Sequence, residues 1–246
     1  MAQKPKTMPC NALELKQAYS LESAVKFSWS SVTGALHPER VETLRRYLKG
    51  KRILDAGCGG GAYVQYLLEQ NFDAYGAEKN ELFYGEAQRR VLDKKRIVKS
   101  DITRLDFPDK YFDTTYCFDV FEHLDDVAAL RELARVTRER IIVTVPRENS
   151  ELQPFGIAFA TYTDLTHLRY YSPDSFYQLL SQIPHSSINI QDEIALDFKS
   201  IALSHLYCRF RFPLISWVFV KLLRFFIRNA EQKKRFAVIL GVLNLP

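Results

Sequence analysis

The sequence predicts an α/β fold with a doubly wound, mostly parallel sheet between two layers of helices. Between residues 51 and 145, short apolar runs alternate with helical patterns. The most apolar run, "RIIVTVP", is typical of a strand in the middle of a parallel sheet. The chain has 246 residues and is 47% hydrophobic, which suffices for one substantial core. The strand–helix alternation therefore implies right-handed crossovers within one sheet.

Five strands are expected in this region, at "RILDA", "FDAYGAE", "RIVKSD", "YFDTTYCFD" and "RIIVTVP". Aromatic and β-branched residues favour extension in the fourth of them. Helices are expected over residues 62–69, after the second strand through Val91, and over "DDVAALRELARVTRE" with Asp125 or Asp126 as its N-cap. Further along, "SPDSFYQLLSQI" predicts a helix capped by Ser172, and "SSINIQDEIAL" and "RFAVILGVLNLP" predict two more strands.

A cluster of glycines follows the first strand, in "LDAGCGGGA". Glycines allow a tight turn from strand to helix and let a ligand approach the backbone, with helix amides facing it. Gly57, Gly59 and Ala62 also fit the dinucleotide fingerprint G-x-G-x-x-G/A. A tight turn that only packs a helix on a strand would give the same pattern, so the neighbouring residues must decide.

Three carboxylates accompany this turn. Glu78 ends the second strand, 19 residues after Gly59, where it could accept both hydroxyls of a ribose. Asp101 follows the third strand, where it could accept a hydrogen bond from an adenine amino group. Asp55 precedes the turn and would repel a pyrophosphate but attract an ammonium. A ligand with adenine, ribose and a charged amino-acid tail suits all three, whereas NAD suits two and is disfavoured by the first.

Three stretches carry a family resemblance: "ILDAGCGGGAYVQYLLEQNFDAYGAEKN", "IVKSDITRLDFPDKYFDTTYCFDVFEHLDD", and "ELARV" with "IIVTVP". Together they resemble the class I S-adenosylmethionine-dependent methyltransferases, and more narrowly the broad bacterial small-molecule group (type 11/12-like) with "EHL" after the fourth strand. The resemblance covers roughly residues 52–181. It implies a Rossmann-like sheet of seven strands in the order 3-2-1-4-5-7-6, with the last strand antiparallel, and S-adenosylmethionine as the cofactor.

The resemblance also implies a position for each part of the cofactor. Around its methionine part it places Asp55, Gly57, Gly59 and Gly61. Around its ribose and adenine it places Glu78, Lys79, Asp101 and Ile102. Asp119, just past the fourth strand, would face the methyl-bearing end.

Two histidines are the predicted catalytic residues. Methyl transfer from a sulfonium is an in-line displacement, and a hydroxyl or carbon acceptor benefits from a base of near-neutral pKa. His123, in "FEHL", follows the fourth strand, and His167, in "TDLTHLRYYS", lies on the loop after the fifth. Two structural interpretations stay open: Glu122 and His123 capping the next helix, and His167 bonded to a nearby backbone carbonyl.

The residues that follow His167 are the predicted substrate contacts, namely Arg169, Tyr170 and Tyr171. No metal site is predicted, since no ligand set with a recognisable spacing occurs. The four cysteines lie far apart without a C-x-x-C spacing, which argues against a disulfide framework and a zinc site and favours a reducing cytoplasm. The polar amino terminus lacks the apolar stretch of a secretory signal, and no apolar run approaches the ~20 residues that span a bilayer.

The chain is expected to have three parts. Residues 1–50 form a helical segment, in which Tyr19, Phe27 and Trp29 could cover the cofactor as a lid or belong to an ordinary packed helix. Residues 51–196 and 235–246 form the cofactor-binding core. Residues 197–234 form a basic amphipathic helical insertion before the last strand.

The insertion concentrates the positive charge of the chain. Between residues 199 and 235 there are nine Lys or Arg and one acid, a net +8, so the remainder carries −3 of the total of +5. Lys221, Arg224 and Arg228 share one stripe of a helical wheel beside Trp217, opposite a broad apolar face. This pattern fits a helical cap over the acceptor pocket or a helix docked peripherally on a membrane surface. RNA binding ranks last, because no recognition module is present.

The function that these observations predict is S-adenosylmethionine-dependent methylation of a small, hydrophobic acceptor. A membrane lipid or an RNA reached through the basic segment is the alternative acceptor. Two further alternatives are a non-catalytic cofactor-binding partner subunit and a small NAD-dependent enzyme.

Overall fold

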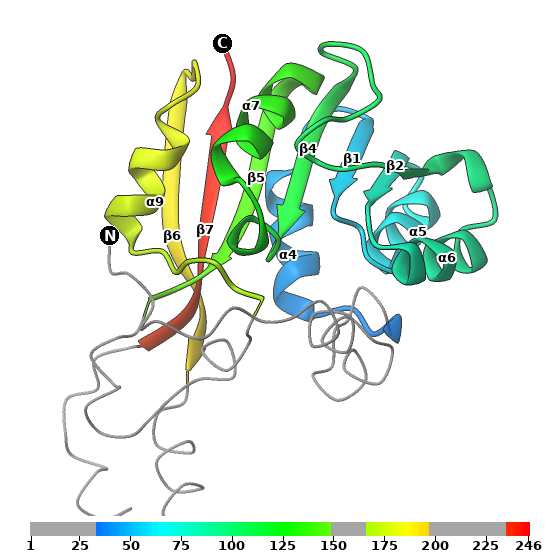
Figure 1. Cartoon of the computed structure of the whole chain (residues 1–246), viewed down its shortest axis with the longest axis horizontal. Coiled ribbons are helices and arrows are strands. Elements are labelled where there is room, and N and C mark those ends of the chain that lie inside the picture. The colour runs from blue at the N-terminus through cyan, green and yellow to red at the C-terminus, as the bar shows by residue number, and fades with distance from the viewer. Residues whose placement is uncertain (1–32, 149–165, 197–234) are drawn as a thin grey trace, which may run out of the picture.

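The computed structural model describes residues 33–148, 166–196 and 235–246 (Figure 1). The proposed lid residues Tyr19, Phe27 and Trp29, the basic segment 197–234 and most of the loop after the fifth strand lie outside the described residues. Within the described part, no helix is both long enough and apolar enough to cross a membrane.

A single sheet of seven strands has the order β3-β2-β1-β4-β5-β7-β6. Its strands are β1 Arg52–Ala56, β2 Asp73–Glu78, β3 Ile97–Lys99, β4 Phe112–Phe118, β5 Thr137–Pro146, β6 Ser187–Leu196 and β7 Arg235–Asn244. The first five pair in parallel, and β7 is antiparallel to both of its neighbours, β5 and β6. The predicted strand order and the antiparallel last strand are confirmed.

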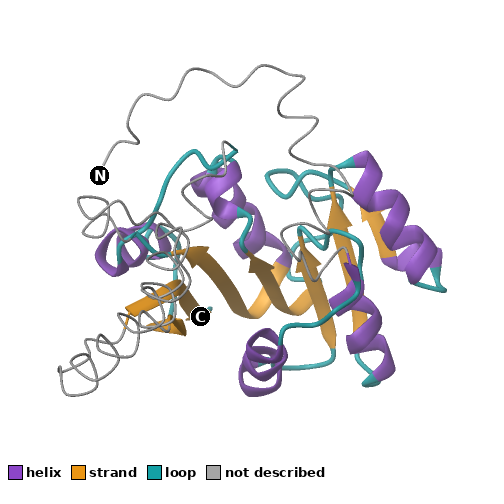
Figure 2. Ribbon diagram, turned by 90° about the horizontal axis from the view of Figure 1, so that it is seen from below, coloured by secondary structure: helices purple, strands orange, loops and turns teal. Residues whose placement is uncertain are grey.

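Helices cover both faces of this sheet (Figure 2). The α-helices described are α4 Pro38–Tyr47, α5 Ala62–Glu69, α6 Glu81–Arg90, α7 Asp126–Val136 and α9 Pro173–Leu180, and two short 3-10 helices are η1 Lys94–Arg96 and η2 Phe121–His123. The two predicted caps are confirmed: Asp125 accepts a hydrogen bond from Ala128 N at 3.0 Å, and Ser172 forms a capping box with Ser175.

The end of α7 differs from the prediction, which ran the helix through Glu139. The helix ends at Val136, because Thr137 adopts an extended backbone with φ −101° and ψ 138° and begins β5. A β-branched residue with a buried partner on the next strand favours this change: the Thr137 hydroxyl donates to Thr115 Oγ1 at 2.6 Å. β5 is therefore three residues longer at its start than "RIIVTVP" alone.

The core has one layer on each face of the sheet. Ile141 and Val143 of β5 belong to the layer that includes the buried residues of α7 and α9. Ile142, between them, belongs to the layer that includes buried residues of α4, α5 and α6. Since successive side chains of a strand point to opposite faces, both faces of β5 are buried, as expected for a central strand.

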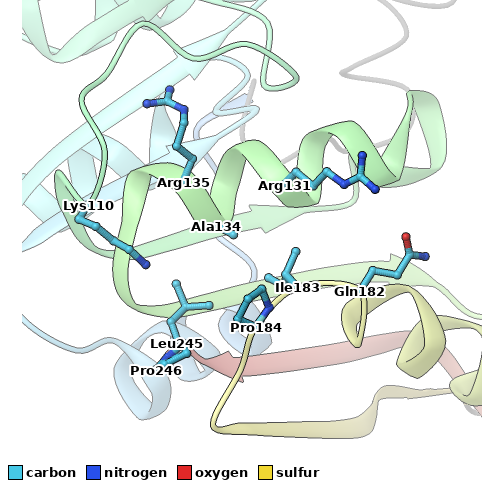
Figure 3. Close-up of a pocket in the computed structure, with 9 residues that line it drawn as sticks. All are labelled: Lys110, Arg131, Ala134, Arg135, Gln182, Ile183, Pro184, Leu245 and Pro246. Atoms are coloured by element: carbon cyan, nitrogen blue, oxygen red, sulfur yellow. The ribbon is translucent and has the colours of Figure 1, made fainter.

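The strand order creates a switch point between β1 and β4, which are neighbours although the connections from them run to opposite sides of the sheet. In open α/β sheets, ligands bind outside the carboxyl ends of the strands at such a point. A separate hollow of about 430 Å³ lies at the other end of the sheet, between α7, the turn after α9 and the carboxyl-terminal Leu245 and Pro246 (Figure 3). The candidate site is therefore sought at the carboxyl ends of β1, β2 and β4.

Candidate functional site

The glycine turn connects β1 to α5 through three residues with left-handed backbone. Gly57, Gly59 and Gly61 have φ values of 86°, 54° and 73°. A Cβ at Gly57 would lie 2.7 Å from Val120 Cγ2, so Val120, just past β4, packs directly on the turn. Gly61 is the N-cap of α5 and provides no side-chain bond to its first turn, which leaves amides there able to bind a ligand.

Glu78 fastens this turn to the end of β2. Its Oε2 accepts a hydrogen bond from Gly59 N at 2.8 Å, and its Oε1 accepts one from Asn80 N at 2.7 Å. Burial raises the pKa of Glu78, against the opposing effect of backbone N–H groups that stabilise the ionised form. Each carboxylate oxygen has a second acceptor position, so Glu78 can hold the turn and still accept ribose hydroxyls.

Asp55 is the most desolvated acid at the switch point. Its side chain is 4% exposed, and burial raises its pKa to about 8, with the Tyr116 hydroxyl acting in the opposite direction and the charge of Glu78 adding to the rise. Among the described residues, none makes a hydrogen bond of normal length and angle to Asp55 Oδ2. A buried carboxylate oxygen without a partner is costly, and a ligand ammonium would satisfy both its charge and its hydrogen-bonding capacity. Asp55 therefore fits the amino-acid tail of the expected cofactor.

The predicted adenine residues lie at the end of β3. Asp101 Oδ2 accepts a hydrogen bond from Lys79 Nζ at 2.6 Å, and its Oδ1 accepts from the Thr103 backbone N at 3.0 Å and hydroxyl at 2.8 Å. Desolvation opposes ionisation, but the bonds from Lys79 and Thr103 outweigh it and lower the pKa of Asp101. Ile102 is buried and belongs to the hydrophobic core.

Asp119 is held by a residue that the sequence reasoning did not single out. It has left-handed backbone, with φ 56°, and its Oδ2 forms an ion pair with Arg40 NH2 at 2.6 Å. Arg40 is 4% exposed and also lies 3.5 Å from Glu193 Oε2. The sequence feature that could have indicated a buried role for Arg40 is its position on the buried face of α4, three residues before Thr43 and four before Leu44.

The two predicted histidines meet at one carboxylate, Glu122. Glu122 Oε1 lies 3.8 Å from His123 Nε2 and 4.0 Å from His167 Nε2. The two imidazole rings are 4.7 Å apart between centroids, at an angle of 67°. The backbone joins the same segments, since Leu168 N donates to Glu122 O at 2.7 Å. The interpretation of Glu122 and His123 as the cap of the next helix is wrong, because Asp125 caps α7.

The three predicted substrate contacts are placed differently from one another. Tyr171 is 3% exposed, and its hydroxyl donates to Asp126 Oδ2 at 2.8 Å, so it packs in the core and its contact with the substrate stays a prediction. Arg169 donates to Leu124 O at 2.6 Å and lies 3.1 Å from the same carboxylate, which gives it a role in holding the loop. The half-buried Tyr170 packs its ring 5.8 Å from that of His167 and stays a candidate contact.

Together, the strand order and the ligand-binding edge define the class: a Rossmann-like α/β fold of the S-adenosylmethionine-dependent methyltransferase type. A family model described as "Methyltransferase domain" matches residues 54–143, from β1 into β5. This part of the chain belongs to that family of class I S-adenosylmethionine-dependent methyltransferases. S-adenosylmethionine is the methyl donor of the family, which favours it over the dinucleotide that the glycine pattern alone allowed.

Curated relatives carry different activities in their names. A tRNA U34 carboxymethyltransferase of Pseudomonas fluorescens is 31% identical over 115 residues, which cover 43% of this chain and 36% of the relative. A ubiquinone biosynthesis O-methyltransferase of Alkalilimnicola ehrlichii is 27% identical over 124 residues, which cover 47% of this chain and 49% of the relative. The chain thus spans half or less of the length of these relatives.

Solved structures share the fold over most of the chain. A SAM-dependent methyltransferase from Archaeoglobus fulgidus has a TM-score of 0.64 and 19% identity, covering 92% of this chain and 99% of its own. The phosphoethanolamine N-methyltransferase 2 of Haemonchus contortus, in complex with S-adenosyl-L-methionine, has a TM-score of 0.65 and 14% identity, covering 98% and 60%.

Proposed function

We propose that this protein transfers a methyl group from S-adenosylmethionine to a small, hydrophobic acceptor. The observation that carries the proposal is Asp55, a buried carboxylate with an unsatisfied oxygen beside the glycine turn. An ammonium suits this position because the ionised Asp55 attracts it, whereas a pyrophosphate would be repelled. The low dielectric around Asp55 strengthens both the attraction and the repulsion.

Each remaining part of the cofactor has a matching group at the same edge. Glu78 accepts the ribose hydroxyls while it holds Gly59, and Asp101 with Lys79 and Ile102 meets the adenine. The left-handed glycines allow the methionine part to lie against the backbone. Asp119, fixed by Arg40, faces the methyl-bearing end. These assignments follow the order of the strands along the sheet.

The chain's own contribution to the reaction is positioning and proton removal. Bound S-adenosylmethionine supplies an electrophilic methyl group on a sulfonium. The protein holds the acceptor atom in line with it and excludes water. His123 and His167 are the groups proposed to act on the acceptor proton, since their Nε2 atoms converge on Glu122 just past β4.

A hydrophobic acceptor is favoured by the aromatic content of the chain and by its similarity to a protein named for ubiquinone biosynthesis. The similarity to a tRNA-modifying protein and the net +8 of residues 199–235 favour RNA as the second candidate. In a non-catalytic partner subunit, the cofactor would bind without turnover.

The test is transfer of label from methyl-labelled S-adenosylmethionine into an extract of the host cells. We expect label in the organic phase, in small molecules that resist ribonuclease. Label that is released by ribonuclease would replace the hydrophobic acceptor with RNA. Binding of the cofactor with no transfer to any fraction would contradict a catalytic role.

A further inference from the structure

We infer that Glu122, His123 and His167 form a binding site for a divalent transition-metal ion. One ligand atom from each residue lies within 4.8 Å of the others. The residues come from two segments that the fold brings together, η2 and the loop before α9. Their spacing in the sequence does not indicate a metal site, because 43 residues lie between the two histidines.

The separations suit an ion between the groups better than direct contact. An N–H···O hydrogen bond spans about 2.7–3.2 Å, so 3.8 and 4.0 Å from Glu122 Oε1 to the two Nε2 atoms are too long for one. Two ligands held about 2.0–2.2 Å from a tetrahedral ion are about 3.4 Å apart. The two distances to Glu122 exceed this value by roughly half an ångström, and every separation in the set is within 4.8 Å. Side-chain shifts of about 1 Å or less would therefore bring all three atoms into coordination range.

The surroundings orient the ligands. Thr166 Oγ1 lies 2.8 Å from His123 Nδ1, which fixes that ring so that its Nε2 faces Glu122. Metal-binding histidines commonly have their other ring nitrogen held in this way. The side chain of Glu122 is 2% exposed and that of His167 is 7% exposed, so an ion bound there would be largely shielded from bulk water.

The donor set selects the kind of ion. Two imidazoles and one carboxylate suit Zn²⁺, Fe²⁺, Co²⁺ or Mn²⁺, whereas Mg²⁺ and Ca²⁺ favour oxygen ligands. Three protein ligands leave coordination positions open, as in catalytic sites.

The ion would lie beside the cofactor turn, because Val120, which packs on Gly57, is two residues before Glu122. An open position would bind a hydroxyl or enol oxygen of the acceptor and lower its pKa, a use that rests on the proposed methyl transfer. With the ion bound, His123 and His167 would serve as its ligands, and the ion, rather than a free imidazole, would promote loss of the acceptor proton.

The test is direct metal binding, measured without cofactor. The purified protein is stripped with a chelator and titrated with Co²⁺, followed by visible absorbance, and with Zn²⁺, followed by calorimetry. We expect one equivalent to bind, and H167A and E122Q to weaken binding by about tenfold or more. The matched control is H185A, since His185 contacts Ile183 O at the opposite end of α9 and should bind as wild type.

Folding and cofactor binding are measured on the same variants. Retained thermal unfolding and retained S-adenosylmethionine binding in H167A would show that its loss of metal is local. Equal Co²⁺ and Zn²⁺ affinities in wild type, E122Q and H167A would overturn the site. If D55N loses the cofactor but keeps the metal, the metal site stands apart from the proposed function. If the wild-type protein binds S-adenosylmethionine but neither Co²⁺ nor Zn²⁺, the metal site alone is overturned.

Discussion

The cofactor half and the acceptor half of the candidate site are formed by different kinds of groups. The cofactor half consists of backbone in left-handed conformation and of acids at the ends of adjacent strands, with Glu78 tying the turn to β2. The acceptor half consists of side chains on η2 and on a loop, converging on Glu122. The first half is fixed by the sheet and suits one ligand. The second depends on contact between loops, so it is the half that can change acceptor without a change of fold.

The largest expected effect is on the cofactor half. Asp55→Asn keeps the shape of the side chain but removes the charge that the ammonium needs, so S-adenosylmethionine should bind about 100-fold more weakly or worse. Isothermal titration of wild type and variant checks this. Asp174→Asn, at an exposed position on α9, is the matched control. Unchanged affinity in D55N would refute the role of this acid.

The next effect should fall on the acceptor half alone. His123→Ala and His167→Ala should each lower kcat by about 100-fold or more, whether the imidazole acts as base or as metal ligand. The affinity for S-adenosylmethionine should stay within about twofold, because neither ring belongs to the cofactor contacts. Single-turnover label transfer measures the rate of methyl transfer, and isothermal titration measures the affinity for S-adenosylmethionine. Full turnover in both variants would remove the histidines from the mechanism.

A smaller effect is expected on stability. Gly57→Ala forces a Cβ to 2.7 Å from Val120 and strains a backbone with φ 86°, so the free energy of unfolding should fall by about 1–3 kcal/mol. Gly85→Ala is the control, since Gly85 lies inside α6 and a Cβ added there would have no neighbouring atom within 4 Å. In Gly85→Ala, the free energy of unfolding should rise by about 0.5–1 kcal/mol. Urea unfolding of both variants checks the contrast, and equal destabilisation would contradict it.

A graded effect is expected from pH. Burial raises the pKa of Asp55 to about 8, so below that pH the unbound protein must lose a proton before it binds an ammonium. The affinity for S-adenosylmethionine should therefore rise by up to about tenfold per unit as the pH approaches 8 from below, and then level off. Titration of the ligand amine is common to wild type and D55N, so the difference between their profiles isolates Asp55. Parallel profiles would contradict the assignment.

Asp55 also makes the stability of the folded protein depend on pH. The folded-state pKa of Asp55 lies above its ordinary value, so the folded state binds the extra proton between about pH 4 and pH 8. Stability contributed by this group is present below that range and is lost as the pH rises through it. D55N should lack this loss in thermal unfolding.

The cofactor half could be predicted from the sequence because its constraints are local. Glycines with positive φ, an acid before the turn and acids at strand ends each follow from their own segment. The caps Asp125 and Ser172 were predictable for the same reason. The strand order came from the family resemblance, which no local pattern supplies.

The acceptor half could not be predicted in full because it depends on tertiary contacts. Nothing local indicates that Glu122 would face two histidines, or that Arg40 of α4 would pair with Asp119 after β4. The burial of Tyr171 could not be predicted either, because its ring packs in the core against Phe176 while its neighbours in sequence lie near the site. The end of α7 was missed because β5 begins directly after it.

The proposed role of Asp55 is to hold the amino-acid tail of S-adenosylmethionine. A direct test compares the affinities of S-adenosylhomocysteine and 5′-methylthioadenosine, which lacks that tail, for wild type and D55N. We expect D55N to weaken binding of the first ligand by about 100-fold and to leave binding of the second nearly unchanged. Equal loss for both ligands, or no loss for either, would contradict this role.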